Sequence, residues 1–252
     1  MTGRFRVRML RPTAVTWAAI AAIAIVIGGC AGFLLGRYAS LPSILPVRFN
    51  RVDRPIGWQY KTYPRVFMPV FVQITLTLIL GTIGSLLMSR SQPVDDDTLL
   101  DGGFAHAGSP ASLAAGDMAA AVAAEAIALF ALIWVSFQAY AALALVTMWN
   151  RGRGDLGYWY TLAIIAGIVL SIVVAVRAQL RLGRPAPRPF VAEHWRFGQL
   201  YRNPDDPALF VPTRDGARWT LNFGRPVAAA LIGICVLLGI VAPATILHLL
   251  LR

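Results

Sequence analysis

Five long apolar stretches, separated by segments rich in arginine, constrain this sequence more than any other feature. The stretches cover residues 14–36, 66–88, 119–148, 158–176 and 227–251. Each holds about 19 or more mainly apolar residues, the length that a helix needs to cross a hydrocarbon core about 30 Å thick. Because that core offers no water to backbone groups, such segments cross it as α-helices. We therefore predict an all-α membrane protein with about five transmembrane helices and a small β-hairpin module.

Composition and charge support this class and argue against a nucleic-acid partner. Hydrophobic residues make up 57% of the 252 residues, above the ~45–50% that is usual for soluble domains. The net charge is +11, and Lys61 is the only lysine among the 23 basic residues. Since the arginines flank the apolar stretches, we assign them to membrane anchoring and to contact with anionic lipid headgroups. No zinc knuckle or pair of RNA-binding aromatic residues accompanies them.

The distribution of basic residues sets the expected orientation. With five spans, fourteen arginines fall on the side of the N-terminus, and nine arginine and lysine residues fall on the other side. Basic residues concentrate on the cytoplasmic side of membrane proteins. We therefore expect a multi-pass protein of the bacterial inner membrane with its N-terminus in the cytoplasm. A cleaved lipoprotein signal ending at Cys30 is an alternative that fits less well, because the apolar run continues through Leu35.

The loops divide the chain into five parts. Residues 1–90 hold two spans and an exterior loop that contains several prolines and Trp58, and residues 91–118 form a flexible acidic loop. Residues 119–176 form a helical hairpin, residues 177–225 a cytoplasmic module, and residues 226–252 the final span. The adjacent aspartates of the acidic loop lack the spaced ligands of a calcium site, so we expect a solvated patch there.

The cytoplasmic module contains the strongest β-sheet signal of the chain. Its first residues include closely spaced prolines, which favour an extended linker. Asp215-Gly216 lies between two β-rich segments and predicts a hairpin turn. We expect residues 209–213 to pair with residues 218–223. A lone hairpin is marginally stable in water, so the aromatic residues of the module should pack on one another or on the membrane surface.

Small and polar residues within the spans predict how the helices associate. Gly28, Gly32 and Gly36 recur every four residues and form a ridge that another backbone can approach closely. We expect this ridge to pack within the chain, and a homo-oligomer formed through the same glycines is the alternative. Gln73 should face a neighbouring helix. Glu125 is the one acidic residue in an apolar stretch, and we expect it at the membrane interface rather than in a proton pathway.

The first loop carries a pattern of proline, aromatic, asparagine and lysine residues. Its members are Leu41, Pro42, Pro46, Phe49, Asn50, Trp58 and Lys61. The pattern resembles the domain-of-unknown-function 1648 family of membrane proteins, although Arg48 stands where that family has histidine. The family also occurs at the front of immunity proteins against toxins of the sporulation-delaying type. The resemblance implies an exterior site for a ligand or a toxin, with these candidate residues: Pro46, Arg48, Phe49, Asn50, Trp58 and Lys61.

The module carries a longer and more specific pattern. Its members are Trp195, Gly198, Tyr201, Asn203, Pro204, Asp206, Pro207, Phe210, Val211, Arg214, Gly216, Trp219, Thr220, Asn222 and Phe223. The pattern resembles a second family, domain of unknown function 5808, which brings no established activity. We expect the module to meet a protein or peptide partner through these candidate residues: Trp195, Tyr201, Asn203, Asp205, Asp206, Trp219 and Asn222.

Catalytic signatures do not support an enzyme. The sequence holds no glycine-rich phosphate loop, no serine nucleophile elbow and no His-Glu-x-x-His helix. Asp205 and Asp206 are explained by turn formation better than by catalysis. We therefore expect no cofactor and no metal. The leading hypothesis is a non-catalytic sensor, scaffold or immunity-like protein; a transporter or its accessory subunit is the second, and an integral membrane enzyme is the third.

Overall fold

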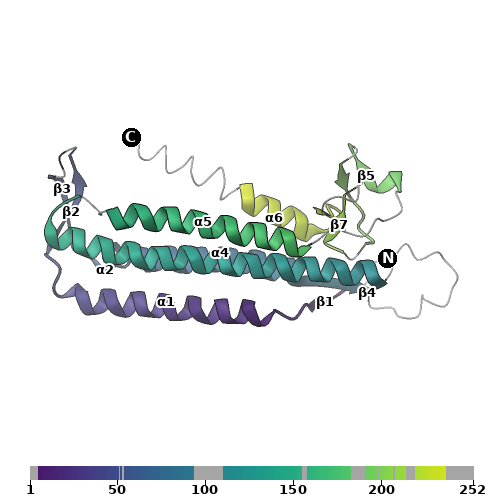
Figure 1. The fold of residues 1–252 in the computed structure, drawn as a ribbon, viewed down its shortest axis with the longest axis horizontal. Coiled ribbons are helices and arrows are strands. Elements are labelled where there is room, and N and C mark those ends of the chain that lie inside the picture. The colour runs from purple at the N-terminus through teal and green to yellow at the C-terminus, as the bar shows by residue number, and fades with distance from the viewer. Residues whose placement is uncertain are drawn as a thin grey trace. The chain divides into compact units, whose positions relative to one another are not determined.

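The computed structural model describes most of the chain and shows a mainly helical protein (Figure 1). The described residues are 5–50, 52, 54–93, 110–154, 158–182, 191–197, 199–206, 208–213 and 219–236. Within them, four helices are long and apolar enough to cross a membrane: α1 (Ala14–Tyr38), α3 (Met68–Met88), α4 (Pro110–Arg151) and α5 (Tyr158–Leu182). The chain is thus a multi-pass, helical membrane protein, as predicted.

The fifth predicted span is described only in its first half. Helix α6 (Pro226–Val236) is apolar and begins within one residue of the predicted start of this span. Residues 237–251, which make up the rest of it, lie outside the described residues. The number of spans therefore stays at four described helices and one prediction.

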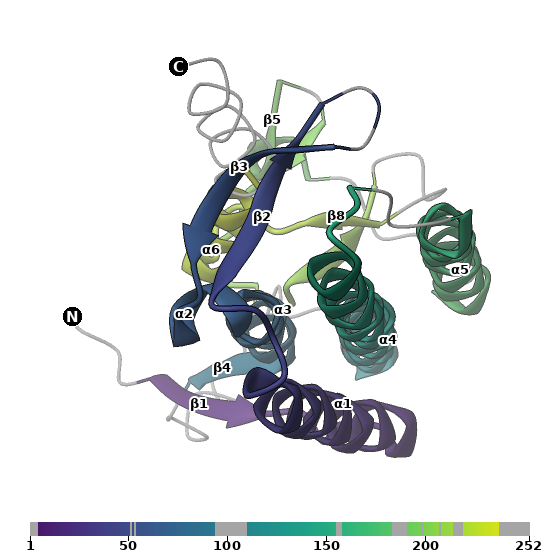
Figure 2. The ribbon, with the colours of Figure 1, turned by 90° about the vertical axis from the view of Figure 1, so that its left-hand side faces the viewer.

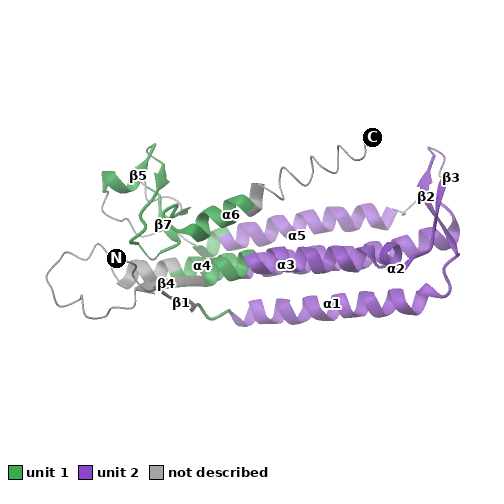
Figure 3. Ribbon diagram, turned by 180° about the vertical axis from the view of Figure 1, so that it is seen from behind, with its two compact units in different colours: residues 1–12, 83–124, 179–252 green, residues 13–82, 125–178 purple. Residues whose placement is uncertain are grey.

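The chain divides into two compact units, which Figure 3 shows in different colours. Unit 1 comprises residues 1–12, 83–124 and 179–252, and unit 2 comprises residues 13–82 and 125–178.

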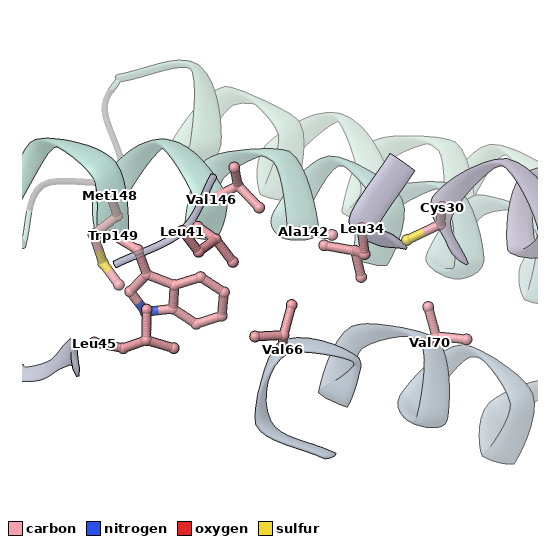
Figure 4. Packing of buried hydrophobic residues seen from close by; sticks show 10 residues of the cluster. All are labelled: Cys30, Leu34, Leu41, Leu45, Val66, Val70, Ala142, Val146, Met148 and Trp149. Atoms are coloured by element: carbon pink, nitrogen blue, oxygen red, sulfur yellow. The ribbon is translucent and has the colours of Figure 1, made fainter. Parts of the chain in front are cut away.

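Unit 2 is a bundle built from α1 and from the larger parts of α3, α4 and α5, which Figure 2 shows end on. Ile23 of α1 packs with Ala131 and Val135 of α4, and Leu76 of α3 lies against them. A second cluster lies at one end of the bundle and contains Cys30, Leu34, Leu41, Leu45, Val66, Val70, Ala142, Val146, Met148 and Trp149 (Figure 4). Helix α4 is the most buried of the four and α5 the least, so α4 is the central helix.

Local sequence explains how α1 begins. The Thr13 hydroxyl accepts a hydrogen bond from the Thr16 amide at 3.1 Å, which satisfies one of the unpaired amides at the helix N-terminus. The four-residue helix α2 (Tyr63–Val66) precedes α3 and has Pro64 in its first turn, where the missing amide proton costs little.

The first loop is a β-hairpin, which the sequence analysis did not predict. Strand β2 (Ile44–Phe49) pairs antiparallel with β3 (Pro55–Tyr60). The side-chain oxygen of Asn50 accepts hydrogen bonds from the Val52 amide at 3.1 Å and the Arg54 amide at 2.9 Å. This asparagine turn reverses the chain, so the hairpin needs no Asn-Gly pair.

The predicted acidic loop is shorter than expected. Strand β4 (Ser89–Pro93) pairs with β1 (Phe5–Met9) within unit 1, and α4 begins at Pro110 instead of residue 119. Proline is favoured in the first turn of a helix, and the following residues are rich in alanine, the strongest helix former. Of the loop, only residues 94–109 remain, and they lie outside the described residues.

Small residues recur every four positions on two helices, as Gly28, Gly32 and Gly36 on α1 and as Ala163, Gly167 and Ser171 on α5, and the two sets differ in their surroundings. Gly167 of α5 is buried, and the Cβ that it lacks would lie 3.9 Å from Ile133 and Trp134 of α4, as expected for close helix packing. Among the described residues, nothing lies within 4 Å of such a Cβ at Gly28, Gly32 or Gly36. The described part of the chain thus shows no packing partner for the ridge on α1, and the expected packing of this ridge within the chain is not confirmed.

The module consists of two small hairpins. The 3-10 helix η2 (Ala192–His194) leads into β5 (Trp195–Arg196), which pairs with β6 (Leu200–Tyr201). Strand β7 (Phe210–Pro212) pairs with β8 (Trp219–Leu221), inside the two segments that the sequence predicted to pair. The predicted turn at Asp215-Gly216 lies outside the described residues.

Candidate interaction surfaces

Asn222 holds the module together from its interior. Its side chain is completely buried. The side-chain nitrogen donates to the carbonyls of Asn203 at 2.8 Å, Asp206 at 3.1 Å and Ala208 at 3.2 Å. The side-chain oxygen accepts from the amides of Asn203 at 3.0 Å and Gly224 at 2.9 Å. One side chain thus replaces a strand of sheet as the hydrogen-bonding partner of the loop between β6 and β7.

A second buried group continues this network. The Asp206 carboxylate accepts from the Tyr201 hydroxyl at 3.0 Å and from the Ala208 amide at 2.9 Å. The Asn203 side-chain oxygen accepts from the Asp205 amide at 3.0 Å, which closes the turn. Burial lowers the pKa of Arg225 below its ordinary value, and the negative charge of Asp206 opposes that shift. The Asp206 side chain therefore stabilises the folded module from its interior.

Gly224 is required by the same packing. A Cβ at this position would lie 2.4 Å from the carbonyl carbon of Asn203 and 2.6 Å from the nitrogen of Pro204. No side chain fits there without moving the backbone. The glycine lets β8 approach the loop closely enough for Asn222 to reach its partners.

The structure assigns the seven predicted partner-binding residues of the module to two groups. Four are buried and form hydrogen bonds within the module: Tyr201, Asn203, Asp206 and Asn222. Asp205 is exposed, while Trp195 and Trp219 are partly exposed. The Trp195 ring packs edge-on against Tyr201 at 5.4 Å, and the buried indole nitrogen of Trp219 has no hydrogen-bond partner among the described residues. Partner binding by the module stays a prediction, and its surface is offered by these last three residues.

The hairpin of the first loop is braced at its base by Lys61. Its ammonium group donates to the carbonyl of Tyr38, the last residue of α1, at 3.0 Å and to the carbonyl of Leu41, just beyond the helix, at 2.8 Å. A cation at a helix C-terminus also favours the helix dipole. The same ammonium lies 4.9 Å from the centre of the Tyr38 ring, and that ring stacks on Tyr63 at 4.2 Å. Lys61, predicted as a ligand-binding residue, thus has a structural role.

Of the other candidate ligand-binding residues of this loop, some are buried or shape the turn and the rest are exposed. Pro46 is buried, and Asn50 makes the turn described above. Phe49 is half-buried, and its ring lies so close to Gly154 that a Cβ on this glycine would be 2.5 Å away. The side chains of Arg48 and Trp58 are exposed.

The hairpin presents an exposed apolar surface. We call it the hairpin patch, and it consists of Ile44, Ile56, Trp58 and Tyr60, which are between 47% and 75% exposed. Ile44 lies directly opposite Tyr60, and Pro46 lies opposite Trp58, so these side chains share one face of the hairpin. Soluble and membrane-exposed surfaces that gather large apolar side chains in this way commonly serve in binding.

The polar side chains within unit 2 link helices to one another. Glu125 is buried and accepts a hydrogen bond at 2.9 Å from the hydroxyl of Thr13, which caps α1. A carboxylate beside a helix N-terminus is electrostatically favourable. Gln73 is completely buried and donates at 2.9 Å to the Val135 carbonyl of α4. Among the described residues, no three His, Cys, Asp or Glu side chains gather to hold a metal ion.

Comparison with known proteins identifies one segment of the chain. A family model described as Family of unknown function (DUF5808) matches residues 204–228, which include Asp206, Asn222 and the start of α6. This match confirms the resemblance of the module to that family. The resemblance of the first loop to the 1648 family stays a prediction. No curated protein and no solved structure matches the chain.

Proposed function

We propose that this chain is a non-catalytic sensor, scaffold or immunity-like protein of the bacterial inner membrane. In this proposal it crosses the membrane five times, with its N-terminus in the cytoplasm, the hairpin of the first loop outside and the module inside. The hairpin captures an exterior ligand, and the module carries the interaction with a partner inside the cell.

The hairpin patch is the observation that carries the proposal. A two-stranded hairpin is marginally stable alone, yet this one is fixed by Lys61 and by the contact between Phe49 and Gly154. A fixed surface loses little conformational freedom on binding, which favours affinity. The large apolar side chains on it suit an apolar peptide, and the exposed Arg48 and Arg54 suit anionic groups on that peptide.

The test uses a membrane-active peptide toxin of the sporulation-delaying type as the probe. Bacteria that express the full chain should survive a dose of this peptide that kills cells without it. The variant Trp58→Ser should lose the protection, because it removes the largest side chain of the patch. The control Gln59→Ser alters an exposed neighbour that points to the opposite face of β3. Killing of cells that express the unaltered chain, or full protection by Trp58→Ser, would contradict the proposal.

The orientation is tested separately. A reporter enzyme that is active only outside the cytoplasm, fused after Arg252, should be active if five spans follow a cytoplasmic N-terminus. A second fusion within the hairpin turn at Val52 should also be active. Activity at Val52 without activity after Arg252 would leave the hairpin outside but remove the fifth span.

A further inference from the structure

The turn between β5 and β6 holds a phenylalanine in an unusual state. Phe197 has a φ of 51°, and its side chain is 96% exposed. Within the described part of the chain, no other residue except a glycine has a positive φ, and no other large apolar side chain is so exposed. Glycine or asparagine would occupy this conformation with less strain and without exposing an aromatic ring. Strained residues of this kind cluster at positions that contact a ligand or a partner.

The surroundings of Phe197 are strongly basic. Arg196 and Arg202 lie on either side of the turn, and both are exposed. The sequence from residue 177 to residue 202 contains six arginines and one acidic residue, Glu193. Clusters of basic residues that follow a membrane span are attracted to anionic lipid headgroups. Arginine suits this role well because its planar guanidinium pairs with phosphate oxygens.

Chain connectivity confines the turn to the neighbourhood of the bilayer. Only eight residues separate Leu182, the last residue of α5, from Val191. Even when fully extended, this link spans only about 30 Å. On the other side of the module, α6 begins at Pro226, directly after the Asn222 network. The module cannot diffuse away from the membrane to which α5 anchors it.

We propose that the Phe197 turn is a lipid-binding site, in which the ring inserts among anionic headgroups while Arg196 and Arg202 pair with lipid phosphates. Phenylalanine is among the side chains that insert at the boundary between headgroups and acyl chains, and the turn places this ring at the tip of the hairpin formed by β5 and β6. The contact fixes the module against the leaflet. A protein partner at this turn is the competing assignment, and the experiment below separates the two.

The experiment places a fluorescent label beside Phe197 while keeping the ring itself. Gln199→Cys, an exposed position in the same turn, is made in the full chain with Cys30→Ala and Cys235→Ala and reconstituted in nanodiscs. Nanodiscs of phosphatidylcholine with phosphatidylglycerol carry a quencher at headgroup depth. The label should be quenched several-fold more strongly than one on Asp205→Cys, the exposed control elsewhere in the module. Phe197→Ser, Arg196→Gln with Arg202→Gln, and pure phosphatidylcholine should each reduce this difference.

Two results would overturn the proposal. One is equal quenching at Gln199 and Asp205 in anionic nanodiscs. The other is strong quenching at Gln199 that Phe197→Ser leaves unchanged, because the ring would then contribute nothing to lipid contact. Shielding of the Gln199 label that arises only on addition of cytosolic protein would assign the turn to a protein partner and equally refute lipid binding.

Discussion

Replacing Asn222 with alanine should open the module. The substitution removes a side chain that serves three carbonyls and two amides, all of them in the segments that surround it. Because Asn222 is completely buried, water cannot take over these interactions without unfolding the loop between β6 and β7. The side chain touches no membrane span in these contacts, so the bundle of unit 2 should be unaffected.

The expected magnitude follows from the groups left without partners. A buried amide that loses its acceptor costs about 1–3 kcal/mol. The buried amide of Asn203 loses the side-chain oxygen at this full cost, and the partly buried amide of Gly224 loses it at a smaller cost, so the two together cost about 2–4 kcal/mol. The loss of donors to three carbonyls adds to it. This is comparable with the whole stability of a small domain, about 5–15 kcal/mol.

Hydrogen–deuterium exchange of the full chain in nanodiscs measures the effect locally. A loss of about 3 kcal/mol corresponds to exchange that is roughly 150-fold faster, and it should appear in peptides that cover residues 203–224. Asp205→Ala is the matched control, because this neighbouring side chain is exposed. Asn222→Asp should also open the module, since a buried carboxylate would face the carbonyls that the amide now serves. Unchanged protection in Asn222→Ala would refute the structural role assigned to this residue.

Three further predictions rest on the same reasoning. Gly224→Ala should open the module in the exchange experiment, because its Cβ would clash with backbone atoms of Asn203. Gly233→Ala should not, because no described atom lies within 4 Å of the added Cβ. Lys61→Met should expose the amides that follow α1 to faster exchange, because it removes two charge-assisted hydrogen bonds, worth about 1.5–3 kcal/mol each. Gly32→Leu should leave the thermal unfolding of the monomer in detergent unchanged, because no atom of the described chain lies near it; a lower melting temperature would show that the ridge is packed.

The membrane spans were predictable because hydrocarbon length and apolar composition are properties of each segment alone. The described α1 begins at the predicted residue and extends two residues beyond the predicted end. The start of α4 was missed because its first turns are rich in alanine and only weakly apolar. The helix therefore begins several residues before the strongly apolar stretch by which it was predicted. Pairing of β1 with β4 joins segments more than 80 residues apart, and no local pattern signals such a contact.

The β7–β8 hairpin and the hairpin of the first loop also show that a structure is predictable from sequence only where a local pattern signals it. Pairing of β7 with β8 was predicted because Asp215-Gly216 is a local turn signal between two β-rich segments. The hairpin of the first loop has no such dipeptide, and its turn depends on the side chain of Asn50. Prolines in and beside its strands also reduce the usual strand signal, although proline is tolerated where a strand has a free edge.

The glycine stripes illustrate why spacing alone does not identify a neighbour. Gly32 and Gly167 each belong to a run of small residues at intervals of four. Gly167 meets α4, which is joined to α5 by a short connection, and the nearby Ser171 hydroxyl accepts from the Trp134 indole at 3.1 Å. Gly32 meets no described atom. Spacing shows that a helix face can be approached closely, but the connections and the polar contacts of the bundle decide whether a helix of the same chain approaches it.

The candidate partner-binding residues of the module show that the sequence does not reveal what a polar side chain binds. An asparagine or aspartate in a loop signals the capacity to form hydrogen bonds, but its partner can be its own backbone or another molecule. In the module, the side chains of Asn203, Asp206 and Asn222 form hydrogen bonds with backbone groups of the module itself. The family pattern that contains them therefore reports a shape that many different partners could use. We therefore propose that recognition depends on exposed positions outside the network. Phe197, which lies outside the pattern, is the residue whose exposure and positive φ the folding of the module does not explain.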